Sequence, residues 1–495
     1  MTTLVHHEFW RDEVAALSFA TAAPNIWSVP AVIHGEGHPA LWYALLHLAH
    51  SIAPTPLILP IVSVAVAAAA VVLFLVRAPF PPWWKALFVL SALPAYEYSV
   101  MARNYGISML LMFAASSIYT APRQQPVLLG LVLFLLANTN VHSALLVPLF
   151  AAMWFFQEFA SNSSTPRAAT GRRPFAHLIG IGLGLSGVVV CLATIYPTNH
   201  DLISYPLSDT GWQQRALEAV VLPGRYFGNV LLPASTTAAA AFDSLVLYLL
   251  AFGLAGEPLL CAAALIGLWL FALLFALVYP GGLRHQGVFL VFVISLYWIH
   301  CSRAVTATAD PASVRPKKLT PSYWAVRAAF PLVFLLLVGR GALKNIRDVQ
   351  FPVTESAALG RVIMGDTRLR DAIVIAEPDY MVESLPYYIN NPTYLTREMR
   401  YGNTVKFTRS ARLDISLGDI LNCAGELRTK TGRRVVILLA QDLTDSPNEQ
   451  VVPVSYGWTF RFTSAQRATF LASTERIAQL RAAAGDENYD VYLLK

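Results

Sequence analysis

The chain has 495 residues, of which 56% are hydrophobic and only 13% are charged, and its mean hydropathy is +0.51. Soluble domains carry about 25% charged residues, so this composition excludes a disordered chain and a nucleic-acid-binding protein and argues against a fully soluble enzyme. The first 341 residues hold 29 charged side chains, whereas the remaining 154 hold 37. We therefore predict a membrane domain over 1–341 and a water-soluble domain over 342–495.

The N-terminal segment 1–38 contains no spanning helix and no cleavable signal peptide, but it carries the triplet Arg11-Asp12-Glu13. Adjacent carboxylates can deprotonate an acceptor hydroxyl or hold a metal ion, and the arginine keeps one of them ionised. The alternative is a solvated helix start, in which the acids lie near the positive end of the helix dipole.

The next cluster is HGEGHPALWYALLHLAH, at 34–50. Glu36 and His38 lie in a turn formed by glycines and a proline, and together they could bind a divalent ion or a phosphate. The alternative is an interfacial, histidine-rich helix, which we favour for His47 and His50.

Ten apolar segments follow, and a bilayer crossing needs about 20 mostly apolar residues. The fold class is therefore a polytopic α-helical membrane protein of about ten spans with a C-terminal soluble α/β domain. The spans are expected at 57–77, 83–99, 104–121, 125–141, 142–158, 175–196, 242–254, 258–279, 285–302 and 323–341.

Loop cations indicate the orientation, because lysine and arginine favour the cytoplasmic side. The richer set of loops is expected inside, and the N-terminal segment, the loops 99–104, 197–241 and 280–284, and the C-terminal domain are expected outside. The outer set holds Arg11, Arg103, Arg215, Arg225 and Arg284. The inner set holds Arg77, Lys85, Arg123, Arg167, Arg172, Arg173, Arg303, Arg315, Lys317 and Lys318.

Two motifs lie at the ends of spans. In SVMARNYGISM, Arg103 and Tyr105 begin a span from the outer side, where an arginine could clamp a lipid phosphate or extend to the headgroups. In NTNVHSALL, His142 follows two asparagines near a hairpin tip. Polar groups at membrane depth suggest a functional site, and satisfied helix-turn groups are an equal alternative.

The last membrane motif is YPGGLRHQGVFL, in which Arg284 and His285 follow a glycine pair and open a span. A glycine-rich turn that leads into a helix N-terminus suits an anion.

The order of these motifs resembles the GT-C superfamily of integral-membrane glycosyltransferases. It consists of an outer Asp-Glu pair, EGHPALWYALL, ARNYG, a histidine after a polar hairpin, and RHQG before a late span. The similarity is to the bacterial branch that is related to protein O-mannosyltransferases and aminoarabinose transferases, and it covers about 1–341. The segment DAIVIAEPDYMVESLPYYI resembles the outer domain of many bacterial members.

The resemblance implies an inverting transfer of a sugar from a polyprenyl-phosphate donor to a glycan, lipid or protein acceptor, at the outer face of the bacterial inner membrane. It implies that Asp12 is the general base, supported by Glu13. Glu36 and His38 match a motif that lies near the donor phosphate and, in some members, a divalent metal. The remaining implied substrate contacts are Arg103, Tyr105, His142, Arg284 and His285, of which the last two would neutralise the leaving phosphate.

Family members carry a spanning helix before the Asp-Glu loop. We expect this chain to lack that helix relative to them; with it there would be eleven spans, with the N-terminus inside and the C-terminus outside.

The soluble domain is predicted to contain strands at 372–378, 433–440, 459–462 and 489–494 and helices at 379–388 and 465–484. In the second helix, Phe470, Leu471, Ile477 and Leu480 are expected to face inward. Three acids, Glu377, Asp379 and Glu383, follow the first strand, where α/β folds often bind ligands. We favour a structural or acceptor-docking role for this domain.

Two other functions fit a chain of this composition. One is a multi-span transporter or flippase, although acids at the bilayer midplane are missing, since Glu97 and Asp243 lie near span ends. The other is a non-catalytic envelope assembly protein whose C-terminal domain binds its partner.

Overall fold

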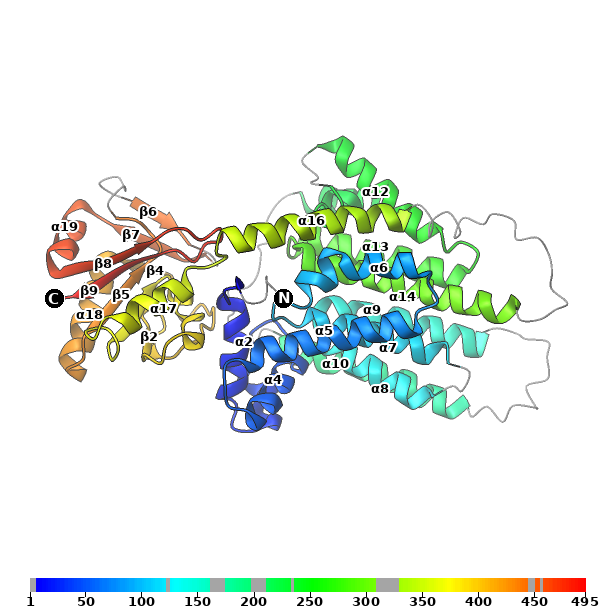
Figure 1. The fold of residues 1–495 in the computed structure, drawn as a ribbon, viewed down its shortest axis with the longest axis horizontal. Coiled ribbons are helices and arrows are strands. Elements are labelled where there is room, and N and C mark those ends of the chain that lie inside the picture. Colours follow the sequence, from blue (N-terminus) through cyan, green and yellow to red (C-terminus); the bar gives the residue numbers. More distant parts are fainter. Residues whose placement is uncertain are drawn as a thin grey trace.

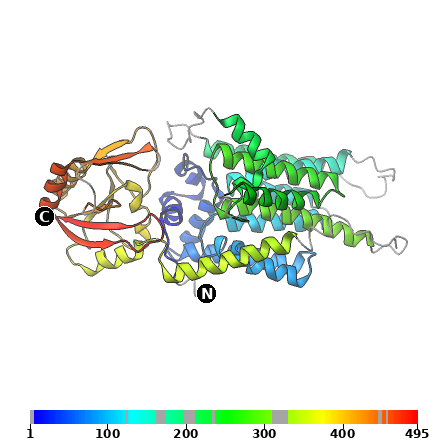
Figure 2. The ribbon, with the colours of Figure 1, turned by 90° about the horizontal axis from the view of Figure 1, so that it is seen from above.

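The computed structural model describes residues 6–121, 125–160, 174–196, 211–232, 236–308, 329–443, 450–454 and 457–495. A helical N-terminal region and a mixed α/β C-terminal region lie end to end, and α16 (Phe330–Gln350) runs between them (Figure 1). The first helices of the chain lie between the two regions (Figure 2). Seven cations that were assigned to inner loops lie outside the described residues, namely Arg123, Arg167, Arg172, Arg173, Arg315, Lys317 and Lys318.

Each predicted span corresponds to a helix, and these helices lie side by side (Figure 1). They are α5 (Ile58–Arg77), α6 (Pro82–Leu90), α7 (Tyr105–Tyr119), α8 (Pro126–Ala137), α9 (Val141–Phe155), α10 (Pro174–Ile195), α12 (Thr237–Phe252), α13 (Pro258–Leu277), α14 (Leu283–Thr308) and α16. Shorter helices outside the predicted spans are α2 (Arg11–Ala22), α3 (Val29–Val32), α4 (Leu41–Ile52) and α11 (Trp212–Val221).

By the criterion of helix length and composition, the structure supports five of the ten predicted spans. Five helices among the described residues are long and apolar enough to cross a bilayer, with mean hydropathies between 1.2 and 2.8. Three further apolar helices, α7, α8 and α12, have only 10–17 residues. The chain is therefore a multi-pass membrane protein with five candidate spans, at Ile58–Arg77, Val141–Phe159, Phe175–Ile195, Pro258–Leu277 and Leu283–Arg303.

The two predicted spans at 83–99 and 323–341 differ most from the observed helices. The first is interrupted after Leu90, and a π-helical turn follows at Leu93–Glu97. Pro94 explains the break, because proline has no N–H and its ring clashes with the carbonyl four residues earlier. The second helix, α16, continues to Gln350, beyond the predicted domain boundary at 341, and residues 323–328 lie outside the described part.

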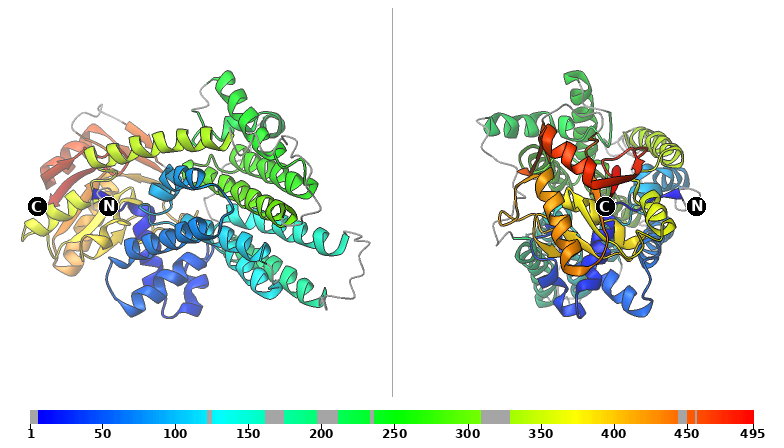
Figure 3. Two further views of the ribbon diagram at one scale, coloured as in Figure 1. Left: turned by 45° about the vertical axis from the view of Figure 1, so that its right-hand side comes forward. Right: turned by 90° about the vertical axis from the view of Figure 1, so that its left-hand side faces the viewer.

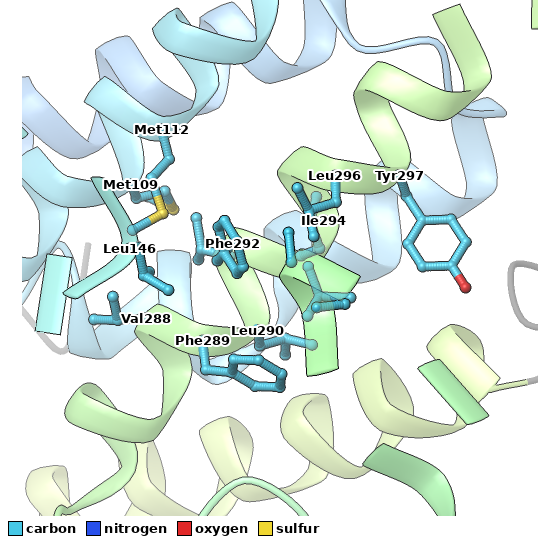
Figure 4. Close-up of a cluster of buried hydrophobic side chains, with 14 of the residues drawn as sticks. Met109, Met112, Leu146, Val288, Phe289, Leu290, Phe292, Ile294, Leu296 and Tyr297 are labelled. Carbon is cyan, nitrogen blue, oxygen red and sulfur yellow. The ribbon is translucent and has the colours of Figure 1, made fainter. Parts of the chain in front are cut away.

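The helical region is organised around α14. Its apolar stretch is 83% buried, the largest share among the candidate spans. Its side chains pack against residues from α7 and α9, including Met109, Met112 and Leu146 (Figure 4). Because α14 is buried on all sides, the direction of its N-terminal end, which carries Arg284 and His285, is fixed by the core.

The α/β region contains two sheets. The six-stranded sheet has the order β3-β2-β1-β5-β9-β8, and the three-stranded sheet has the order β4-β7-β6. Strand β1 is parallel to β2 and β5, and β9 is antiparallel to β5 and β8. The strands are β1 (Ile373–Glu377), β2 (Thr393–Leu395), β3 (Arg400–Tyr401), β4 (Asp414–Ser416), β5 (Val435–Leu439), β6 (Gln450–Pro453), β7 (Thr459–Phe462), β8 (Thr474–Leu480) and β9 (Tyr489–Leu494).

All four predicted strands are confirmed as β1, β5, β7 and β9. The apolar runs of β1 and β5 are buried along their whole length, because helices cover both faces of the sheet. Residues of α17 (Ser356–Gly365) share a core with Val374 and Val436. Residues of α18 (Leu417–Thr431) and α19 (Ser464–Ser473) share the opposite core with Ile373 and Ile437.

The two predicted helices of this region were wrong in part. The helix at 465–484 ends at Ser473, and Thr474–Leu480 instead forms β8, which pairs with β9. The apolar spacing was helical, but without β8 the strand β9 would have an unpaired edge. The helix at 379–388 is replaced by two 3₁₀ turns, at Asp379–Val382 and Leu385–Tyr387. Pro386 explains why no continuous α-helix forms, because it has no N–H to bond the carbonyl of Val382, four residues earlier.

Candidate functional site

Asp12 lies where the helical and α/β regions meet, in the first turn of α2. Its Oδ2 is 3.7 Å from Nη2 of both Arg103 and Arg284, and its Oδ1 is 4.0 Å from Nε of Arg11. Arg103 also donates to the backbone carbonyl of Asp12. The Asp12 side chain is nevertheless 33% exposed, so one carboxylate faces three guanidinium groups and remains accessible to a ligand.

The charge on Asp12 follows from these neighbours. Burial raises the pKa of its carboxyl, but Arg103, Arg284 and Arg11 together lower it more, so the pKa lies below its ordinary value. Asp12 is therefore ionised at neutral pH, and the main causes are Arg103 and Arg284, ahead of the adjacent Arg11 that the sequence suggested.

His38 is a second side-chain partner of Arg103, in addition to Asp12. The predicted turn is present, with positive φ at Gly35 (89°) and Gly37 (77°). Nε2 of His38 is 3.1 Å from Nη2 of Arg103, and its Nδ1 is 3.2 Å from the Glu36 carbonyl oxygen. Because a guanidinium can only donate, Nε2 is the acceptor and Nδ1 carries the proton. Burial, reinforced by Arg103, lowers the pKa of His38 to about 4, so the ring is neutral.

Glu36 is a second carboxyl group at this site, and its pKa is shifted in the opposite direction to that of Asp12. Burial raises its pKa to about 8; Asp12 adds to the rise, and Arg103 and Lys406 oppose it. At neutral pH, Glu36 is therefore mostly protonated and can donate a hydrogen bond, whereas Asp12 can only accept one.

The contacts of Glu36 and His38 do not suit the predicted divalent metal. Both ring nitrogens of His38 are engaged, one by a guanidinium. Over the described ranges, no group of three or more His, Cys, Asp and Glu side chains is arranged to hold a metal ion.

Glu13 is turned away from Asp12 and fully buried. It accepts hydrogen bonds from the backbone N–H of Ala102 (2.6 Å) and of Trp10 (3.3 Å), and it lies 3.1 Å from Nε2 of His7. Since Ala102 precedes Arg103, Glu13 holds the loop that presents this arginine to Asp12.

His7 is buried between the carboxylates of Glu13, at 3.1 Å, and Asp348 of α16, at 3.7 Å. Burial lowers the pKa of His7, but the two carboxylates raise it more, to about 9. A histidine whose pKa is raised by folding stabilises the protein fully below its unfolded value of about 6.5, and this stabilisation is lost as the pH rises through 9.

We therefore expect His7→Gln to be more destabilising at pH 6 than at pH 10, with a difference of about 3 kcal/mol. Thermal unfolding of the detergent-solubilised wild type and variant at the two pH values measures this difference. An equal loss of stability at both pH values would show that the charge on His7 does not contribute.

Tyr105, His142 and His285 form a ring cluster directly behind Arg284. The ring centroid of His285 lies 5.2 Å from that of Tyr105 and 5.1 Å from that of His142. Nδ1 of His285 accepts the N–H of Gly282 at 2.9 Å. Neither ring nitrogen of His142 has a hydrogen-bond partner in the described part of the chain. Of the two asparagines before His142, Asn140 caps α9 through the N–H of Ser143 at 2.8 Å. Asn138 donates to the carbonyl oxygens of Phe134 and Gly187, at 2.9 and 3.1 Å.

A groove of about 920 Å³ extends from Arg284 along the start of α14. Besides Arg284, it is lined by Arg225, Arg340 and Lys344, and by the glycine pair of the predicted anion motif. Arg225 is paired with Glu218 at 2.8 Å and Lys344 with Glu97 at 2.5 Å. Arg340 donates to the carbonyl of Gly228 at 3.0 Å. The groove is thus cation-rich, and one of its lining residues, Arg284, lies 3.7 Å from Asp12.

Sequence reasoning missed several of these residues. Arg340 and Lys344 are four residues apart and share one face of α16, a spacing that is visible in the sequence, but they lay at the edge of the predicted membrane domain. Gln286 was also missed. It orders the groove by donating to the carbonyls of Gly281 (2.7 Å) and Tyr226 (2.8 Å).

The α/β region lies over this end of the membrane helices (Figure 3). The hydroxyl of Tyr388 donates to the carbonyl of Phe9 at 3.1 Å, and the guanidinium of Arg11 lies 4.6 Å from the ring centroid of Tyr380. Two of the three acids predicted near a ligand form hydrogen bonds inside the domain. Glu377 accepts from the guanidinium of Arg397, and Asp379 accepts from the Thr396 hydroxyl and the backbone N–H of Arg397. Glu383 is buried and its carboxylate accepts the N–H of Val405 at 2.8 Å.

The fold and the site together define a multi-pass membrane protein with an α/β domain positioned over a cluster of arginines and carboxyl groups. Comparison of the chain with protein-family models and with curated proteins found no match.

Proposed function

We propose that the protein is a membrane glycosyltransferase that moves a sugar from a polyprenyl-phosphate donor to an acceptor hydroxyl at the outer face of the bacterial inner membrane. The observation that carries the proposal is that Arg284 belongs both to the cation-rich groove and to the group around Asp12. A phosphorylated lipid in the groove would bring its phosphate to Arg284 and its sugar to Asp12.

In the proposed reaction, the acceptor oxygen attacks C1 of the sugar and gives its proton to Asp12, while the bond between C1 and the phosphate oxygen breaks. The polyprenyl phosphate leaves with the bonding electrons, and inversion at C1 follows from the direct displacement. Arg103 and Arg284 neutralise the charge that develops on the phosphate, which is commonly the largest catalytic contribution.

The low pKa of Asp12 in the free protein is consistent with this reaction. A general base works best when its pKa is near the operating pH. In the free protein, however, the neighbouring arginines hold the pKa of Asp12 below its ordinary value. A donor phosphate bound to Arg103 and Arg284 offsets their charge and therefore raises the pKa of Asp12. Donor binding thus prepares the base.

The direct test uses the purified protein in nanodiscs with a panel of radiolabelled polyprenyl-phosphate sugars and cell-envelope extract as acceptor. We expect label in a glycan, lipid or protein product and release of polyprenyl phosphate. Movement of the labelled lipid across the bilayer without transfer would instead identify a flippase. Binding of envelope components with neither activity would identify an assembly protein.

A further inference from the structure

The first turn of α2, which carries Asp12, is held by the loop between β8 and β9, close to the other end of the chain. The backbone N–H of Arg11 donates to Oε1 of Glu487 at 2.8 Å. The guanidinium of Arg11 forms two parallel hydrogen bonds to Asp486, at 3.0 and 2.8 Å. Arg11 and Asp486 are 475 positions apart in the sequence. Their contact therefore joins the helical region to the α/β region.

Helix α2 depends on this external carboxylate at its N-terminus. The N-cap residue is Trp10, which makes no side-chain capping bond and has no acceptor atom. A carboxylate that accepts a free N–H at a helix N-terminus both satisfies that donor and interacts favourably with the helix dipole. Glu13 of α2 itself accepts the N–H of Trp10, and Glu487 accepts the next free N–H, that of Arg11, which no side chain of α2 accepts in the described part of the chain.

Glu487 is rigidly held within the α/β region. Its carboxyl group is 1% exposed. Its Oε2 accepts hydrogen bonds from Thr354 at 2.6 Å and Ser356 at 3.1 Å, and its carbonyl oxygen accepts the N–H of Glu355 at 3.0 Å. One carboxylate oxygen is thus bound to the α/β region and the other to α2, so a displacement of the α/β region would be transmitted to the first turn of α2.

Asp486 affects Asp12 through Arg11. The guanidinium of Arg11 is closer to Asp486, at 2.8 Å, than to Asp12, at 4.0 Å. Arg11 is therefore kept at the domain junction, and Oδ2 of Asp12 lies at ion-pair distance from Arg103 and Arg284. Without Asp486, Arg11 would lose its shortest ion pair and keep only the longer ones to Glu487, at 3.8 Å, and to Asp12, at 4.0 Å. Its guanidinium could then move closer to Asp12 and occupy the proposed base.

We infer that Asp486 and Glu487 are positioning residues for sugar transfer. Through its β8–β9 loop, the α/β region orients Asp12, the proposed base. The site can therefore catalyse transfer only when the α/β region is docked on α2. The inference rests on the proposed function and adds to it a catalytic requirement for the soluble domain.

The test compares Glu487→Ala and Asp486→Ala with the conservative Glu487→Gln, which keeps an acceptor oxygen. Glu426→Ala is the matched control, because Glu426 forms an exposed ion pair with Lys430 on α18 in the same region. Misplacing a reacting group by about 1 Å can cost a hundredfold in rate. We therefore expect the two alanine variants to lower kcat by roughly tenfold to a hundredfold with an unchanged KM for the donor, and Glu487→Gln to restore most of the loss.

Hydrogen–deuterium exchange of the α2 peptide provides a readout that does not depend on activity. We expect faster exchange at the start of α2 in Glu487→Ala and no change in Glu426→Ala. Unchanged exchange would show that the cap is not formed, and faster exchange with full activity would show that the cap does not position Asp12; either result overturns the inference. If the wild type transfers no sugar, the proposed function fails, and the exchange experiment still decides whether the contact exists.

Discussion

Asp12→Asn is expected to abolish sugar transfer, with a loss in kcat of roughly 10²–10⁴-fold, the usual contribution of a general base. Asparagine has nearly the same shape but cannot take the proton of the acceptor hydroxyl. The carboxylate is one-third exposed, and the nearly buried Arg103 keeps its bond to the backbone carbonyl of residue 12, so the protein should insert and fold. The measurement is transfer from labelled polyprenyl-phosphate sugar, together with detergent-stable yield and thermal unfolding.

Asp366→Asn is the matched control for this variant. Asp366 forms a partly exposed ion pair with Arg368 in the α/β region, remote from the site, and its replacement should leave transfer unchanged. Full activity of Asp12→Asn would remove Asp12 as the base, and a loss of folded protein in parallel with activity would show that its role is structural.

Arg284→Ala should weaken use of the donor more than use of the acceptor. A hydrogen bond to a charged group contributes about 1.5–3 kcal/mol, which corresponds to a rise of roughly tenfold to a hundredfold in donor KM. Loss of a positive neighbour also raises the pKa of Asp12, so the acidic limb of the pH–rate profile should move to higher pH.

Arg77→Ala is the matched control for Arg284→Ala, because Arg77 is an exposed arginine at the last position of α5 and lines neither the groove nor the group around Asp12. Steady-state kinetics with each substrate varied in turn separate the two KM values. Equal changes in donor and acceptor KM would contradict a phosphate-binding role for Arg284.

Much of the fold could be predicted from the sequence because its strongest signals are local. The buried apolar runs of β1 and β5 and the hydrophobic stretch of α14 each identify one element without reference to the rest of the chain. Pairing is not local: β8 has the apolar spacing of a helix and becomes a strand because β9 lies beside it. The prediction for 83–99 had a different limitation: it relied on apolar composition and did not include the break that Pro94 causes within the segment.

In the candidate site, too, some features follow from local motifs and others only from the tertiary fold. Asp12, His38, Arg103 and Arg284 lie together as the motifs predicted, although the motifs are up to 272 positions apart. The protonation of Glu36, the inward turn of Glu13 and the anchoring of Arg11 by Asp486 and Glu487 depend on burial and on contacts between the two regions. No sequence pattern encodes these contacts, because each joins segments that only the tertiary fold brings together.

The most direct test of the central claim is a cryo-electron microscopy structure of the protein in nanodiscs with a polyprenyl-phosphonate sugar, a donor analogue that cannot be cleaved at C1. We predict that the phosphonate group lies between Arg103 and Arg284 at ion-pair distance from both, that the lipid chain occupies the groove beside α14, and that C1 of the sugar faces Asp12. A phosphonate bound away from both arginines, or a sugar that points away from Asp12, would contradict the account.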